Sequence, residues 1–187
     1  MSTLTSLPNL LTLMRIMLIP VFVCIFYLPF AGAHAVAAII FALASFTDWL
    51  DGYFARKLKQ ISLFGAFLDP VADKLLVAST LLLLVGEKDI HYIVFPAIVI
   101  VGREIVISAL REWMAEMGNR ASVAVSYIGK VKTAMQMIAL ILLIMYPPMA
   151  SWLGAIGFIL LYVAAILTIW SMVVYLSMAW PQLIKKT

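Results

Sequence analysis

Long hydrophobic runs follow one another along nearly the whole chain and are separated by short breaks. Runs of about 20 apolar residues are long enough to cross a lipid bilayer as helices. The breaks contain proline, glycine or charged residues, as in Pro29 to Gly32, the turn at 86–89 and Pro147-Pro148, and these can end a helix. The predicted helical spans are 8–28, 33–57, 66–86, 91–113, 126–146 and 152–180. We therefore expect an all-α polytopic membrane protein with about six transmembrane helices, in which residues 1–187 form a single domain.

The composition agrees with this pattern. Of the 187 residues, 65% are hydrophobic and only 12% are charged, which is more apolar surface than a soluble domain of this size needs. Cys24, the single cysteine, lies in an apolar run and is expected to be a small buried residue. The first helix is expected to be retained rather than removed as a signal peptide, because no basic residue precedes it.

The basic residues are concentrated on one side of the predicted topology. If the N-terminus is cytoplasmic, 12 of the 13 basic residues fall on or next to the cytoplasmic side, and the opposite loops hold only Lys88. The positive-inside rule favours this orientation, with both termini in the cytoplasm. The net charge of +4 therefore indicates topology and contact with anionic membrane lipids. Nucleic-acid binding is not expected, since the basic residues are scattered between apolar segments.

Four aspartates stand out because they lie in an otherwise apolar region. Asp48 and Asp51 are three residues apart, and Asp69 and Asp73 are four apart, so each pair shares one helix face. Carboxylates at membrane depth are costly unless they face a wet cavity or a partner. Four converging carboxylates would repel one another, and a hard divalent cation would neutralise that repulsion. The segment therefore predicts an enzyme site built around metal and phosphate, at the cytoplasmic boundary of the membrane.

Other interpretations of the aspartates remain. A charged stretch at the end of a membrane helix is often only a solvated cap, although four aspartates are harder to explain in this way than two. A divalent-cation transporter would use them as its binding site, but it predicts acidic residues deep within several spans and a route to both faces. A lipid-binding scaffold without activity would not need four carboxylates. A metal-dependent enzyme is the leading interpretation.

The spacing of these residues matches a known signature. The run Asp48-x2-Asp51-Gly52-x2-Ala55-Arg56-x8-Gly65-x3-Asp69-x3-Asp73 resembles that of the CDP-alcohol phosphotransferases at every position. Stretches 8–15, 111–116 and 129–133 resemble the bacterial CDP-diacylglycerol–glycerol-3-phosphate 3-phosphatidyltransferases within that family. The resemblance covers essentially the whole chain. It implies the family's helical bundle, placed in a bacterial inner (cytoplasmic) membrane and forming a homodimer.

The resemblance also implies a reaction, in which the phosphatidyl group of CDP-diacylglycerol is transferred to glycerol 3-phosphate and CMP is released. By similarity, Asp48, Asp51 and Asp69 would bind a pair of Mg2+ or Mn2+ ions. Asp73 would be an additional metal ligand and the general base that takes a proton from the acceptor hydroxyl. The residues implied to lie against the CDP-lipid are Gly52, Ala55, Arg56 and Gly65, together with Asn9, Thr12 and Arg15. These last three form a polar stripe on the first helix, which could equally pack against another helix; Gly65 could also serve the preceding turn.

The phosphate of the acceptor needs cations in its pocket. The candidates are Arg103, Arg111, Lys130 and Lys132, which the topology places on the cytoplasmic side of the fourth and fifth helices. They could instead anchor helices among lipid headgroups or pair with Glu104, Glu112 and Glu116. Because the aspartate signature does not identify the acceptor, the same chemistry with inositol phosphate, serine or phosphatidylglycerol remains an alternative.

Overall fold

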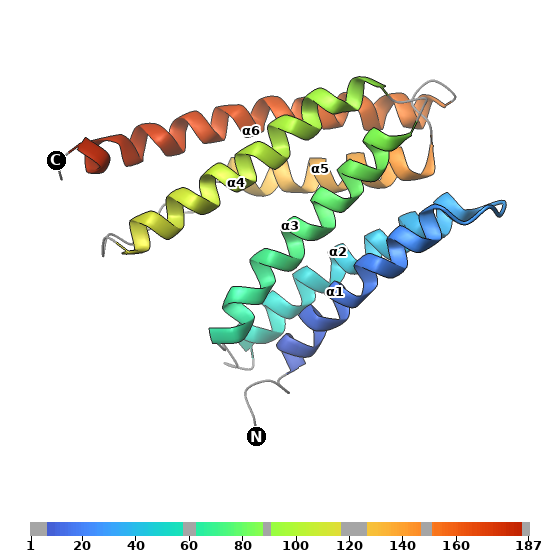
Figure 1. Ribbon diagram of the computed structural model, residues 1–187, viewed down its shortest axis with the longest axis horizontal. Coiled ribbons are helices and arrows are strands. Elements are labelled where there is room, and N and C mark those ends of the chain that lie inside the picture. Colours follow the sequence, from blue (N-terminus) through green and yellow to red (C-terminus); the bar gives the residue numbers. More distant parts are fainter. Residues whose placement is uncertain (1–6, 58–62, 88–90, 117–126, 147–150, 185–187) are drawn as a thin grey trace.

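The structure, a computed structural model of the 187-residue chain, describes residues 7–57, 63–87, 91–116, 127–146 and 151–184. In these ranges it is entirely helical (Figure 1). The helices are α1 (Leu7–Phe26), α2 (Ala33–Lys57), α3 (Leu63–Gly86), α4 (Val94–Glu116), α5 (Tyr127–Met145) and α6 (Trp152–Ile184), with a short 3₁₀ helix, η2 (His91–Ile93), before α4.

The six predicted helices are confirmed, and most of their boundaries agree within a few residues. The largest difference is at α6, which continues to Ile184; α3 begins three residues earlier than predicted, at Leu63, and α4 is shifted by three residues at both ends. Proline is best tolerated in the first turn of a helix, but Pro70 lies in the second turn of α3. Because α3 begins at Leu63, Asp69 and Asp73 lie in its second and third turns.

The helices form two groups of three that contact each other (Figure 1). In the first group α1 packs along α2 and α3; in the second, α6 packs along α5 and α4. Contacts of α2 with α5 and of α3 with α4 join the groups. The turn between α1 and α2 contains Gly32, whose φ of +102° is a backbone conformation that residues with a side chain rarely adopt.

The interior has an apolar half and a polar half. Phe22, Phe41 and Leu140 are fully buried at the end of the bundle where α1 and α5 finish. Five of the buried polar side chains lie toward the opposite end, where α1, α3 and α5 begin: Asn9, Thr12, Arg15, Lys132 and Gln136. Because consecutive long helices alternate in direction, residues far apart in the sequence meet in this polar half.

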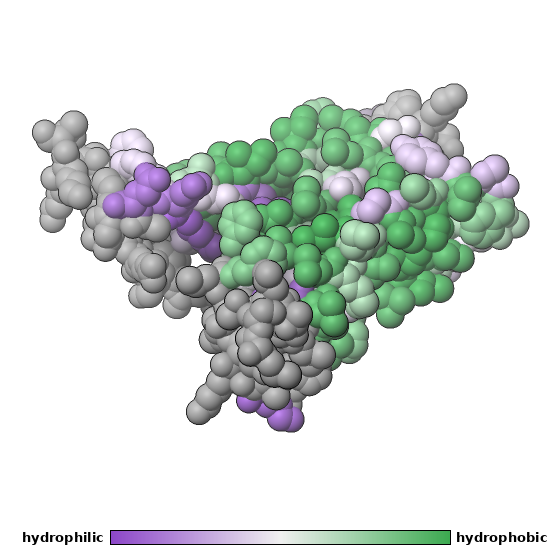
Figure 2. Space-filling view, turned by 60° about the horizontal axis from the view of Figure 1, so that its bottom comes forward, coloured by the Kyte–Doolittle hydropathy of each residue, from purple (hydrophilic) through white to green (hydrophobic). Residues whose placement is uncertain are grey.

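Much of the outer surface is apolar, as the green surface in Figure 2 shows. Among the described residues, the segments Asn9–Phe26 and Trp152–Ser177 are long and apolar enough to cross a membrane, and most of their residues are not buried in the bundle. Cys24 is exposed, so its predicted burial is wrong. The inward face of α1 carries Phe22 and Phe26, four residues apart, and Cys24 points to the other side of the helix.

Candidate functional site

Arg15 joins two of the four aspartates. Its Nη1 donates hydrogen bonds to Asp48 Oδ1 at 2.9 Å and to Asp73 Oδ1 at 2.5 Å. The arginine side chain is completely buried, whereas the side chains of Asp48 and Asp73 are 44% and 41% exposed. One buried guanidinium from α1 therefore fixes carboxylates of α2 and α3 that remain accessible from outside.

Thr12 makes the corresponding contact with a third aspartate. Its hydroxyl donates a hydrogen bond to Asp69 Oδ1 at 2.5 Å, and its side chain is fully buried. Thr12 and Arg15 are one turn apart on α1, and Asp69 and Asp73 are one turn apart on α3. Since α1 and α3 run in the same direction, the two pairs meet in register.

The polar stripe of the first helix thus packs against the helices that carry the aspartates. Of its two predicted roles, helix packing is confirmed for Thr12 and Arg15 by their contacts. Asn9 is buried on the same stripe. Contact of these three residues with a CDP-lipid stays a prediction.

The carboxylates are the kind of ligand that magnesium and manganese prefer. In the part of the chain that the structure describes, no group of three or more His, Cys, Asp or Glu side chains converges on one point. Instead, Arg15 lies between Asp48 and Asp73 and supplies positive charge there. The chemistry of the three described aspartates suits a divalent ion, and their contacts with Thr12 and Arg15 on α1 orient them.

Part of the signature cannot be placed. Four of its residues belong to the last turns of α2, but their side chains lie outside the described residues: Asp51, Gly52, Ala55 and Arg56. Gly65 is buried within the first turn of α3. Its role in the preceding turn and its contact with a ligand both stay predictions.

A cavity of about 540 Å³ opens beside Asp48 and Asp73, between α2, α3, α4 and α5. Its charged and hydroxyl-bearing lining residues are Asp48, Asp73, Lys74, Glu104, Ser108, Lys132 and Thr133. Gln136 and apolar side chains such as Val77 and Ile100 form the rest of the wall. A cavity lined by both carboxylates and lysines can hold a small, negatively charged, hydroxyl-bearing molecule.

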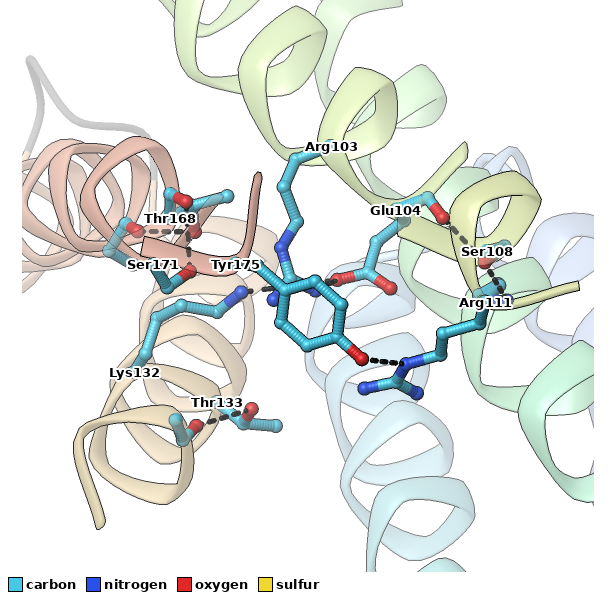
Figure 3. Close-up of polar contacts among 12 residues, drawn as sticks. Arg103, Glu104, Ser108, Arg111, Lys132, Thr133, Thr168, Ser171 and Tyr175 are labelled. Atoms are coloured by element: carbon cyan, nitrogen blue, oxygen red, sulfur yellow. Dashed lines mark hydrogen bonds and ion pairs between the residues drawn. The ribbon is translucent and has the colours of Figure 1, made fainter. Parts of the chain in front are cut away.

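Glu104 lines this cavity and pairs with two cations, Lys132 in the cavity lining and Arg103, which is not one of the lining residues (Figure 3). Arg103 Nη1 donates a hydrogen bond to Glu104 Oε1 at 2.8 Å, and Lys132 Nζ lies 3.9 Å from the same oxygen. The side chains of Arg103 and Lys132 are 15% and 6% exposed. The predicted pairing of these cations with glutamate is confirmed for Glu104, and one carboxylate facing two cations leaves an excess of positive charge.

Lys74 and Ser108 form a second polar contact across the cavity wall. The ammonium of Lys74, on α3, donates a hydrogen bond to the Ser108 hydroxyl on α4. The same hydroxyl donates to the backbone oxygen of Glu104 at 2.6 Å, one turn earlier (Figure 3). Neither residue is among the predicted binding residues. Their signal in the sequence is weak, although Lys74 directly follows Asp73 and Ser108 is one turn after Glu104.

Arg111 and Lys130 are the other two predicted acceptor residues. Arg111 is exposed on α4, and its Nε donates a hydrogen bond to Tyr175 Oη on α6 at 3.2 Å (Figure 3). Its guanidinium carbon lies 5.6 Å from the centre of the Tyr175 ring, which is a cation–π arrangement. The side chain of Lys130 lies outside the described residues. The binding roles of both stay predictions.

Comparison with known proteins adds independent information. Residues 5–170 match the model of the CDP-alcohol phosphatidyltransferase family. A protein of Salmonella typhimurium named CDP-diacylglycerol–glycerol-3-phosphate 3-phosphatidyltransferase is 55% identical over 174 residues, which cover 93% of this chain and 94% of the relative. A protein of the same name from Yersinia enterocolitica is 53% identical over 180 residues, covering 96% and 98% of the two chains.

Proposed function

This chain belongs to the CDP-alcohol phosphatidyltransferase family, and on that premise we propose that it transfers the phosphatidyl group of CDP-diacylglycerol to glycerol 3-phosphate. The products are phosphatidylglycerophosphate and CMP. Relatives with 53–55% identity over more than nine-tenths of the chain carry the name of this activity. The structural observation that carries the proposal is the cavity that Asp48 and Asp73 share with Lys132.

The aspartates serve as ligands for divalent ions, Mg2+ or Mn2+, and two ions suit four carboxylates. Asp48, Asp51 and Asp69 hold them, with Asp73 as a further ligand. A bound divalent ion supplies positive charge that neutralises the pyrophosphate and stabilises the departing CMP. The hydrogen bonds from Thr12 and Arg15 keep three of these carboxylates in fixed orientations, as outer-shell partners commonly do.

Asp73 acts as the general base. It lines the cavity, is partly exposed, and is held by Arg15, so an acceptor hydroxyl in the cavity can reach it. The hydroxyl oxygen attacks the phosphorus of the phosphatidyl group, and its proton passes to Asp73. The bond from that phosphorus to the oxygen of CMP breaks, and CMP leaves with the electron pair. One direct displacement of this kind needs no covalent enzyme intermediate.

The acceptor phosphate binds on the opposite side of the cavity, near Lys132 and Arg103. Both cations are largely shielded from water and share the single carboxylate of Glu104, so a phosphate dianion would compensate the remaining charge. Arg111 and Lys130 are further candidates for this role. Gly52, Ala55, Arg56 and Gly65 are the candidates for contact with the cytidine diphosphate.

The protein is a polytopic membrane protein of the bacterial inner membrane, with its termini and active site facing the cytoplasm. Its apolar outer surface and two long apolar helices support this placement. The polar half of the interior lies at one end of the bundle, where a soluble acceptor would enter from the cytoplasm. A homodimer in the membrane is part of the same proposal.

The test is release of CMP by the purified protein in detergent, with CDP-diacylglycerol, magnesium and a panel of acceptors. We expect metal-dependent release with glycerol 3-phosphate and none with serine, inositol phosphate or phosphatidylglycerol. Release with another acceptor instead would keep the chemistry and overturn the assigned acceptor. Absence of release with every acceptor, from folded protein, would overturn the enzyme assignment and favour cation transport.

A further inference from the structure

Lys74 is a cation of the cavity that pairs with no carboxylate among the described residues. It is half-buried and lines the cavity together with Asp73, the residue before it. In that part of the chain its ammonium has no Asp or Glu at ion-pair distance, and its hydrogen-bond partner is the neutral hydroxyl of Ser108. A half-buried ammonium is expensive to keep without an anion, so its position favours an anionic ligand.

The neighbours of Lys74 indicate which part of the reaction this ligand belongs to. Ser108 donates a hydrogen bond to the backbone oxygen of Glu104, and the Glu104 carboxylate lies beside Arg103 and Lys132. Lys74 is thereby connected to the α4 and α5 wall, where the acceptor phosphate is placed. The signature residues assigned to the nucleotide lie instead on α2 and at the start of α3.

We propose that Lys74 binds the phosphate of the acceptor together with Lys132, and that Ser108 is a positioning residue for the Lys74 ammonium. This inference rests on the proposed function. A phosphate between the two lysines would receive charge from α3 and from α5, while its glycerol hydroxyl extends toward Asp73. Because Lys74 and Asp73 are adjacent in α3, binding of the phosphate by Lys74 holds the acceptor hydroxyl close to Asp73, the general base.

The test compares Lys74→Met and Lys74→Arg in the full chain, assayed with CDP-diacylglycerol, magnesium and varied glycerol 3-phosphate. Lys57→Met is the control, because Lys57 is an exposed lysine at the end of α2 outside the cavity lining. We expect Lys74→Met to raise the KM for glycerol 3-phosphate about 10- to 100-fold. The KM for CDP-diacylglycerol should stay within about threefold. Lys74→Arg should restore most of the affinity, and Lys57→Met should behave as wild type.

Ser108→Ala is the second variant, and it keeps the inference testable if Lys74→Met does not fold. It retains the lysine but removes its hydrogen-bond partner, so the KM for glycerol 3-phosphate should rise by about 3- to 10-fold. Sulfate, another dianion, should inhibit the wild type competitively with glycerol 3-phosphate. Its inhibition should weaken in both variants by a factor similar to the change in KM.

Two results would overturn the inference while leaving the proposed function intact. One is an unchanged KM for glycerol 3-phosphate in Lys74→Met and Ser108→Ala, with normal sulfate inhibition. The other is a larger rise in the KM for CDP-diacylglycerol than for the acceptor, which would move Lys74 to the pyrophosphate. If wild-type protein formed no phosphatidylglycerophosphate at all, the proposed function would fail, and this inference with it.

Discussion

Arg15 Nη1 lies 2.5 Å from Asp73 Oδ1 and belongs to a side chain that is completely buried, although the carboxylate it holds is 41% exposed. The same nitrogen also bonds Asp48. A candidate catalytic base and a candidate metal ligand are therefore oriented by one residue of another helix. Removing that residue should affect both the stability of the fold and the behaviour of the metal site.

Arg15→Ala should lower the free energy of unfolding by about 1–3 kcal/mol, because two partly exposed carboxylates lose the hydrogen bonds from their buried cation. Transferase activity should fall by at least about 100-fold, since Asp73 loses its orientation. Added magnesium should raise the unfolding temperature of the variant more than that of the wild type, because uncompensated carboxylates attract a cation more strongly. Thermal unfolding in detergent, with and without magnesium, measures this. If magnesium raised the unfolding temperature of both proteins equally, Arg15 and magnesium would not neutralise the same carboxylates.

Thr12→Val should weaken metal binding while changing the side-chain shape very little. Thr12 is fully buried and donates a hydrogen bond to Asp69, so valine leaves that carboxylate oxygen without its donor. We expect a loss of about 1–2 kcal/mol in stability and an increase of about 10-fold in the magnesium concentration for half-maximal activity. Thr12→Ser keeps the hydroxyl and serves as the matched control. If Val and Ser gave the same magnesium dependence, the hydrogen bond would have no part in the site.

Helical periodicity predicts which site residues share a face, but not which faces meet. The spacing of Asp69 and Asp73, and of Thr12 and Arg15, is enough to place each pair on one side of its own helix. The bonds of Arg15 to Asp48 and Asp73 span 33 and 58 residues of sequence. Such contacts depend on the packing and rotation of whole helices, which local spacing does not determine.

The residues predicted to bind the acceptor also show that the sequence does not determine which helix faces meet. Lys132 and Arg111 are equivalent in the sequence, since both are basic and lie near the cytoplasmic ends of their helices. The rotation of α5 buries Lys132 against Glu104, whereas α4 presents Arg111 to Tyr175 on its exposed side. The sequence indicates Lys74 only as part of the charge bias, and its place in the cavity follows from the contact of α3 with α4.

Gly157 and Gly102 differ in the space available for a side chain. A Cβ added at Gly157 on α6 would lie 2.8 Å from Leu142 Cβ and 3.2 Å from the Ala139 backbone oxygen on α5, whereas one added at Gly102 would meet nothing within 4 Å. Gly157→Ala should therefore destabilise the fold by about 1–3 kcal/mol. Gly102→Ala should be neutral or stabilising by up to about 1 kcal/mol, because alanine is the better helix former. Thermal unfolding of both variants checks this, and equal effects would mean that α5 and α6 do not pack so closely.

Asp73→Asn should separate binding from turnover. The amide oxygen of asparagine can still accept the hydrogen bond from Arg15, so the fold and the binding of CDP-diacylglycerol should be retained. The amide cannot take the acceptor proton, and kcat should fall by about 100- to 10,000-fold. Single-turnover CMP release, together with equilibrium binding of the liponucleotide, measures the two effects separately. Activity near that of the wild type would remove Asp73 from the role of base.

Lys132→Met should act on the acceptor rather than on the liponucleotide. The side chain of Lys132 is 6% exposed, and its ammonium lies 3.9 Å from Glu104 Oε1 in the cavity, so methionine fills a similar volume while removing the charge. We expect the KM for glycerol 3-phosphate to rise about 10- to 100-fold, with a change of less than about threefold in the KM for CDP-diacylglycerol. Steady-state kinetics with each substrate varied in turn measures the two KM values. A proportional rise in both KM values would indicate that Lys132 supports the fold of the cavity rather than the binding of the acceptor phosphate.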